Sequence, residues 1–558
     1  MNSPVSFFSR IYKQSTWLFP FMIYLAALAI WPNAGLGNNG HCDAWYYWGM
    51  SQSSEIVRNT ISWDFYPASR APLYLFGWLI PSSLDPIIWS KLLMLGNVLW
   101  PLIFIPLGLR RTAWKLAINS YLLASLMPIV FSQSSASYAG VTYNLLCILG
   151  LVLFLSDAKS QTFLTIGILS GLIIFSNVQT LVLVPPIVYL IFTITQSNRA
   201  KKFLVMLLGF FFSYFVLVVL LGLGGLTLLQ SISFPNIQIR TLFNMIGEET
   251  FFGSLQNPWY VATPLMMFHI SIILLLSNSK VRSLNIFPIS LLKITVIQFF
   301  FLIFGQLAGL SVTFQSGFHA IFGYWVVVPL IYFVLVEEER KKNSRLFLIF
   351  FIFALHILIS QAIFFTLKNM EQKLQLVTFS LLLPALCVII WLGIVSFWEK
   401  FKSRFGIWIL IFLPLLCMSP TDYSAAFYNS DNKPVTNSDT WSKFQYKAAS
   451  QTVNIFSEKL SSSTAVGAIE NPENVFQTSL LRASVRSFSS CGFAWSRFES
   501  LNDLLSSNSE KWPDHIILGS YRYIDDNEWA SIFSSAIQIK RYRLEIGAVP
   551  IYWTEIFK

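Results

Sequence analysis

Apolar stretches of about twenty residues recur along the first 420 residues of the chain, and they constrain the fold more than any other feature. A helix of this length matches the roughly 30 Å hydrocarbon layer of a bilayer. With 55% hydrophobic and 12% charged residues, the chain is too apolar for a soluble protein. The sequence therefore predicts an α-helical polytopic membrane protein with about thirteen transmembrane helices, at 15–32, 87–109, 113–131, 138–156, 162–177, 180–195, 203–229, 259–277, 287–310, 318–336, 346–366, 375–397 and 406–420. The segment 162–195 is interrupted by polar residues and prolines, so it is either one hairpin or two full spans.

The distribution of basic residues predicts which side of the membrane each loop occupies. If the N-terminus is cytoplasmic, the inner segments carry eighteen Lys and Arg, and the outer loops carry five. This asymmetry follows the positive-inside rule. It predicts a multi-pass protein of the cell (inner) membrane with an uncleaved first span and an extracytoplasmic first loop at about 33–86. The net charge of +11 is scattered over short cytoplasmic turns, which excludes a nucleic-acid partner.

The composition changes after Pro420. We therefore divide the chain into a transmembrane domain at 1–420 and an extracytoplasmic soluble domain at 421–558. Short apolar runs at 465–470 and 515–520 predict buried strands, and the segments 498–505 and 527–536 predict helices. The tail is thus expected to be a small α/β domain, entered through a polar linker at 421–445.

Cysteines and histidines show no metal-ligand spacing, and the sequence contains no P-loop. No metal site is assigned, and whether a divalent cation assists is left open. Cys42 and Cys491 are both placed outside, so a disulfide between them is one open alternative.

Acidic residues are concentrated in the first outer loop. It holds four of the twelve acids that precede the tail, and all twelve fall in loops or at span ends. Ion-coupled carriers usually keep ionisable groups at mid-membrane, so this pattern disfavours a coupled carrier. In the same loop Asp43 precedes an aromatic run at 45–48, and Arg70 opens the sequence Arg-Ala-Pro-Leu-Tyr.

This arrangement resembles the polyprenyl-phosphate-dependent membrane glycosyltransferases of the GT-C class, with protein O-mannosyltransferases and lipid A aminoarabinose transferases closest in layout. The resemblance in topology covers nearly the whole chain, but the residue match is confined to about 43–74. It implies a polyprenyl-phosphate sugar donor and a lipid, glycan or protein acceptor at the outer face of the membrane. In that family a second acid commonly follows the first, whereas here Ala44 follows Asp43.

The chemistry of such a transfer needs a base for the acceptor and fixed cations for the departing phosphate. Asp43 is the candidate base, with Glu55 and Asp64 as replacements. Arg70 offers a two-pronged donor for phosphate. The further substrate-binding candidates are Arg240 on an expected loop at 231–258, Lys91 near the outer end of the second span, the aromatic residues Trp45, Tyr46 and Tyr66, and His319.

Each assignment has a structural alternative. Asp43 could cap the helix that follows it, and Arg70 could anchor the second span at the headgroup level. The aromatic residues could form an interface belt, and His319 could be structural.

Two other classes of function are compatible with the sequence. One is a polysaccharide polymerase or ligase, and the other is a non-catalytic lipid-linked sugar translocase, for which Lys293 is the clear basic residue within a span. The missing second acid also leaves a degenerate, non-catalytic relative open.

Overall fold

The computed structural model describes the chain in segments. The continuous segments are 43–62, 66–125, 138–155, 159–194, 198–248, 288–307, 439–460, 464–470, 474–488, 495–498, 514–532, 538–546 and 549–557. Shorter pieces lie at 20–21, 24–25, 28, 273, 276–277, 328–329, 331–333, 335–336, 427–428 and 434–435. The predicted spans at 346–366, 375–397 and 406–420 lie outside the described residues, as do Cys42 and Cys491. The thirteen-helix architecture therefore stays a prediction.

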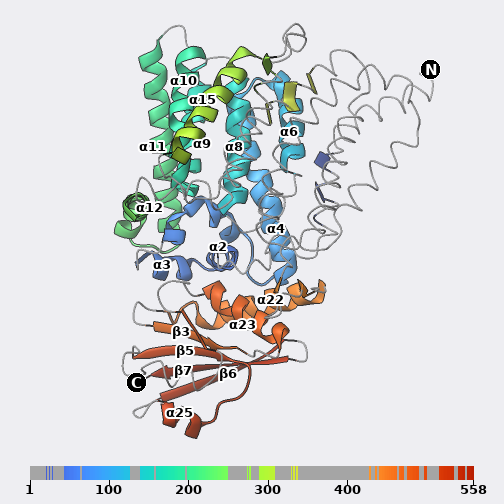
Figure 1. The fold of residues 1–558 in the computed structure, drawn as a ribbon, viewed down its shortest axis with the longest axis vertical. Coiled ribbons are helices and arrows are strands. Elements are labelled where there is room, and N and C mark those ends of the chain that lie inside the picture. The colour runs from blue at the N-terminus through green and yellow to red at the C-terminus, as the bar shows by residue number, and fades with distance from the viewer. Residues whose placement is uncertain are drawn as a thin grey trace, which may run out of the picture.

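The first part of the chain forms a bundle of apolar helices (Figure 1). Its elements are α4 (Pro86–Leu99), which continues through η4 (Trp100–Ile103) into α5 (Phe104–Gly108), then α6 (Arg111–Ser125), α8 (Tyr138–Phe154), α9 (Ser160–Ser176), η5 (Val178–Leu183), α10 (Val184–Ile194), α11 (Arg199–Leu223) and α15 (Ile289–Leu307). Each helix coincides with an apolar stretch of the sequence. The interrupted segment 162–195 forms two helices, α9 and α10, separated by the 3-10 turn η5.

Two of these helical stretches are long and apolar enough to cross a bilayer. They are Pro86–Gly108 and Arg199–Leu223, with mean hydropathy of 1.6 and 2.8. Large apolar side chains on α11, such as Phe211 and Phe215, are more than half exposed. An exposed apolar surface of this kind is costly in water and is typical of a face that contacts lipid.

Helices α9 and α11 pack closely through small residues. A Cβ atom on Gly167 would lie 1.9 Å from the Met206 carbonyl oxygen, and one on Gly171 would lie 2.0 Å from the Ser213 hydroxyl. A Cβ on Gly209 would lie 2.3 Å from the Leu164 carbonyl oxygen. Small residues spaced four apart on both helices let the backbones approach, which is a common packing mode of membrane helices.

The prediction for 203–258 needs correction. The apolar helix ends at Leu223, and Gly225 adopts φ +91°, a left-handed conformation that glycine tolerates best. The expected loop at 231–258 is wrong over 231–248, because these residues belong to helix α12 (Leu228–Glu248). This helix crosses the lower end of the bundle in Figure 1.

The turns at one end of the bundle are basic. There the Thr162 hydroxyl donates to the Gly108 carbonyl oxygen over 3.2 Å, and the Lys202 ammonium lies 5.5 Å from the centre of the Phe163 ring. These contacts bring together the turns that carry Arg110, Arg111, Lys159, Arg199, Lys201 and Lys202. The opposite end of the bundle lies toward the C-terminal domain (Figure 1). It holds α12 and the first-loop elements α2 (Asp43–Gln52), α3 (Ser54–Ser62), η1 (Tyr66–Ser69), η2 (Ala71–Leu73) and η3 (Leu75–Leu79).

The C-terminal part is a five-stranded mixed sheet with helices on both faces (Figure 1). Its strand order is β4-β3-β5-β7-β6, with β4, β3 and β5 parallel and β7 antiparallel to both β5 and β6. The elements are α22 (Asp439–Phe456), β3 (Thr464–Ile469), α23 (Val475–Phe488), β4 (Trp495–Phe498), β5 (His515–Ser520), α25 (Asp526–Ile532), β6 (Gln538–Ile546) and β7 (Val549–Phe557). A short antiparallel pair, β1 (Phe427–Tyr428) and β2 (Pro434–Val435), precedes it. Side chains of β7 contribute to the cores on both faces of the sheet. The Trp553 ring packs against Phe456 of α22 on one face, and Ile556 packs with Trp529 of α25 on the other.

The predicted strands at 465–470 and 515–520 are confirmed as β3 and β5, and the helix predicted at 527–536 is confirmed over Asp526–Ile532. The helix predicted to begin at Phe498 is wrong at that residue, because Trp495–Phe498 pairs with β3 as strand β4. The linker predicted at 421–445 is also wrong at its end, since α22 begins at Asp439. Residues 499–505 lie outside the described part of the chain.

Helix α2 packs directly against the C-terminal domain. A Cβ atom on Gly49 would lie only 1.6 Å from the Ser487 carbonyl oxygen of α23. The Trp45 and Trp48 rings lie 5.6 and 5.8 Å from the ring of Tyr446 in α22. The first loop and the sheet domain thus share one buried interface.

Candidate functional site

Arg70 lies at the centre of the best-defined polar cluster in the first loop. Its Nη1 atom donates to the Tyr47 hydroxyl over 2.9 Å. Its guanidinium carbon sits 4.2 Å from the centre of the Tyr66 ring. Arg70 is 5% exposed, so the charge is held in a partly dehydrated environment where electrostatic attraction is stronger than in water.

The local sequence explains how the backbone reaches this position. Pro67 and Pro72 each fall in the first turn of a 3-10 helix, where the fixed φ of proline fits and its missing N–H costs nothing. Arg70 joins these two turns: its N–H donates to the Pro67 carbonyl over 3.2 Å, and its own carbonyl accepts from the Leu73 N–H over 3.1 Å. The Tyr74 hydroxyl donates to the Ala68 carbonyl over 2.6 Å, and burial raises the pKa of this tyrosine.

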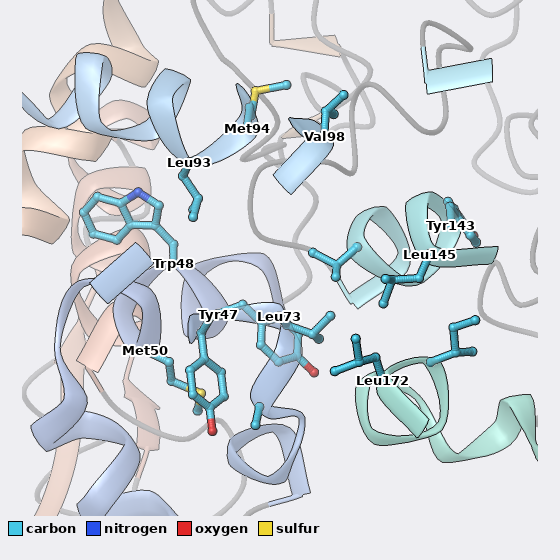
Figure 2. Packing of buried hydrophobic residues seen from close by; sticks show 14 of the residues in the cluster. Tyr47, Trp48, Met50, Leu73, Leu93, Met94, Val98, Tyr143, Leu145 and Leu172 are labelled. Atoms are coloured by element: carbon cyan, nitrogen blue, oxygen red, sulfur yellow. The ribbon is translucent and has the colours of Figure 1, made fainter. Parts of the chain in front are cut away.

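The remaining aromatic residues of α2 are buried in packing. Trp48 donates its indole N–H to the Ser90 hydroxyl over 3.0 Å, and its ring meets Trp89 edge-on at 5.8 Å. Trp45 and Tyr46, predicted to contact the sugar, are 3% and 4% exposed, so neither presents a ring face at the surface. Figure 2 shows Trp48 beside Leu93 of α4, within the large buried cluster that also contains Tyr47. Of the predicted aromatic residues, Tyr66 is the one whose ring faces Arg70.

The candidate bases are placed differently. Asp43 is the first residue of α2, four positions before Tyr47, and its side chain is outside the described part. Glu55 lies in the first turn of α3 and forms an ion pair with Arg58 one turn later. Asp64 lies outside the described residues. A further acid of the loop, Asp85, caps α4 by accepting from the N–H groups of Ile87 and Ile88.

The other predicted substrate contacts are dispersed. Arg240 is exposed on α12, the helix that packs against the turn preceding Arg70. Lys91 is half-buried on α4, and His319 lies outside the described residues. Lys293 is exposed on α15, so it does not point to an internal basic cavity. The structure thus joins Arg70 with Tyr66 and brings the helix of Arg240 beside them.

Two contributors were not assigned these roles from the sequence. Tyr47 belongs to the aromatic run at 45–48, and the structure shows that its hydroxyl is a hydrogen-bond partner of Arg70. Gln238 of α12 donates to the carbonyl of Ser69, the residue before Arg70, over 2.9 Å. The local sequence around Gln238 does not predict this contact, because its partner is 169 residues away.

A second charged cluster lies in the C-terminal domain, around Glu555 of β7. Its carboxylate accepts from the Tyr542 hydroxyl over 2.7 Å and from the Lys459 ammonium over 3.0 Å, and it lies 3.1 Å from the His515 Nε2 atom. Burial alone would raise the pKa of Glu555, but the hydrogen bonds from Tyr542 and Lys459 and the charge of Lys459 lower it below its ordinary value. Lys459, His515 and Tyr542 each contact the Glu555 carboxylate. We therefore interpret this cluster as one that stabilises the sheet.

Within the described segments, no three His, Cys, Asp or Glu residues are grouped so that they could hold a metal ion. No protein-family model matches the sequence, and no curated protein or solved structure is significantly similar to it.

Proposed function

We propose that the chain is an integral membrane glycosyltransferase. It transfers a sugar from a polyprenyl-phosphate donor to a lipid, glycan or protein acceptor at the outer face of the cell membrane. The observation that carries the proposal is the position of Arg70, whose guanidinium is buried between the Tyr47 hydroxyl and the Tyr66 ring at the end of an apolar bundle. A cation fixed at that level suits a phosphate whose lipid tail lies in the membrane.

Pre-organisation of this arginine supports a phosphate-binding role. A guanidinium matches two phosphate oxygens with two parallel N–H groups, but only when its plane is oriented. The Tyr66 ring and the Tyr47 hydroxyl restrict that plane from two directions. As the sugar leaves, negative charge grows on the phosphate, and a fixed cation stabilises it without reorganisation.

The position of Asp43 supports its assignment as the base. Asp43 begins α2, about one helical turn before Tyr47, whose hydroxyl binds Arg70, so its backbone lies near the candidate phosphate site. In the proposed reaction the carboxylate takes a proton from the acceptor hydroxyl or amine. The acceptor atom then bonds to the anomeric carbon, and the carbon–oxygen bond to the phosphate breaks with the electron pair leaving on phosphate.

The arrangement of the two bundle ends supports the proposed sidedness. The basic turns lie at the end of the bundle opposite α2, α3 and the C-terminal sheet (Figure 1), and Arg70 belongs to the same first loop as α2 and α3. If that basic end is cytoplasmic, as the positive-inside rule requires, Arg70 and the sheet domain face outward. We therefore place the site and the C-terminal domain at the outer surface of the cell membrane.

Binding of a synthetic polyprenyl phosphate to the full-length protein in lipid nanodiscs tests this proposal. Arg70→Ala should weaken binding by about 10- to 100-fold, the range expected for hydrogen bonds to a charged group. Arg70→Lys should recover only part of the loss, because a point charge lacks the two-pronged geometry. Arg58→Ala serves as the control, since Arg58 is an exposed arginine of the same loop that pairs with Glu55. Equal affinity of the wild type and Arg70→Ala would remove the basis of the proposal.

A further inference from the structure

Gln238 makes a double contact that the reaction scheme above does not use. Its side chain is 1% exposed, and its amide nitrogen donates to the Ser69 carbonyl over 2.9 Å and to the Phe175 carbonyl over 2.8 Å. Both partners are carbonyl oxygens, which only accept, so the nitrogen of the amide must face them. The Gln238 amide group therefore donates its two N–H groups to two segments that are far apart in the sequence.

The two carbonyls belong to structurally different elements. The Ser69 carbonyl is part of the peptide bond whose nitrogen belongs to Arg70. Phe175 lies in the last turn of α9, where carbonyl oxygens have no partner within the helix. Gln238 thus fastens the Arg70 peptide unit to the end of a helix in the bundle.

The backbone hydrogen bonds described for Arg70 itself stay within its own turn, and the adjoining buried turn η2 packs against α8, α9 and α11. Arg70 has φ −87° and ψ 59°, near the inverse γ-turn, and its backbone bonds are to Pro67 and Leu73, both within three residues. Packing of η2 holds the turn against the bundle, and Gln238 adds a directional hydrogen-bonded link between the Arg70 peptide unit and α9. The position of helix α9 is itself well fixed, because its glycines allow it to pack closely against α11.

We propose that Gln238 is a positioning residue for the phosphate-binding arginine, an inference that rests on the proposed function. Tyr47 and Tyr66 orient the guanidinium, whereas Gln238 fixes the backbone from which this side chain extends. Helix α12 therefore belongs to the donor site even though Gln238 itself touches no substrate.

The test compares Gln238→Leu and Gln238→Glu with the matched control Asn236→Leu, an exposed position on the same helix. The Glu variant keeps the shape of the side chain but turns an acceptor oxygen toward the two carbonyls, so it remains informative if the Leu variant does not fold. Two quantities are measured on full-length protein in nanodiscs: hydrogen exchange of the peptide 66–74, and affinity for a synthetic polyprenyl phosphate.

We expect both Gln238 variants to speed exchange in 66–74 and to weaken polyprenyl-phosphate binding about tenfold, with Asn236→Leu unchanged in both measurements. Faster exchange together with wild-type affinity for polyprenyl phosphate would mean that Gln238 only stabilises the turn. That result would overturn the inference. Unchanged exchange would overturn it as well. If Arg70→Ala itself binds polyprenyl phosphate normally, the proposed function fails, and the exchange data still report separately whether Gln238 holds the Arg70 turn.

Discussion

At the scale of single residues, the guanidinium of Arg70 is oriented by its neighbours within the protein itself. A guanidinium on a free loop samples many orientations, and ordering a long side chain costs free energy when the ligand arrives. Here the Tyr47 hydroxyl and the Tyr66 ring already restrict that motion. Part of the entropic cost of binding is therefore met during folding, which favours affinity for a phosphate held at one fixed place.

Asp43→Asn is the sharpest test at the same scale. Asn caps a helix about as well as Asp, so the variant preserves a purely structural role. If Asp43 is the general base, transfer should fall by roughly 10²- to 10⁴-fold while polyprenyl-phosphate binding is retained. Turnover measured beside donor affinity separates these effects. Near-normal turnover would mean that Asp43 has only a structural role at the start of α2, and Glu55 and Asp64 would then be tested as the base.

At the scale of elements, two contacts define how the helices are arranged. The α9–α11 pair is held by backbone approach at Gly167, Gly171 and Gly209. The chain leaves α11 after Leu223, turns at Gly225 and then forms α12 across the end of the bundle. Without that crossing, no element would bring Gln238 to the first loop.

Gly167→Leu should separate α9 from α11, because any Cβ at this position would meet the Met206 carbonyl at 1.9 Å. Overpacking of this kind destabilises by about 1–3 kcal/mol, and more where backbone is the obstacle. The thermal midpoint of the protein in detergent should fall accordingly. Gly222→Leu is the control for helix propensity, since the nearest atom to its Cβ position is 3.9 Å away. Equal midpoints for the two variants would contradict the close packing.

At the scale of the whole molecule, the helical bundle and the sheet domain meet through α2. Gly49 allows the α23 backbone to approach, and Tyr446 fills the space beside Trp45 and Trp48. The other contacts of the same helix hold Arg70 through Tyr47. The C-terminal domain is thus part of the structure that supports the candidate site.

The sidedness of the molecule is predicted from its charge. A reporter active only outside the cytoplasm should work when fused after Lys558, and a reporter active only inside should work after Arg345. The expectation rests on eighteen basic residues in the inner segments against five in the outer loops. A cytoplasmic C-terminus would require a different number of spans and would separate the sheet domain from an outward-facing Arg70.

The sequence alone determined those apolar helices that the structure describes and two buried strands of the tail, because hydrophobic length and periodicity are local properties. It also singled out Arg70 and Tyr66 within one short segment. The helix at 228–248 escaped prediction because its polar residues and Pro235 resemble a loop, and only packing against the first loop explains the buried Gln238. The tertiary structure alone decided that Tyr47 meets Arg70 across 23 residues and that Gln238 meets Ser69 across 169, since such pairings depend on how whole helices pack.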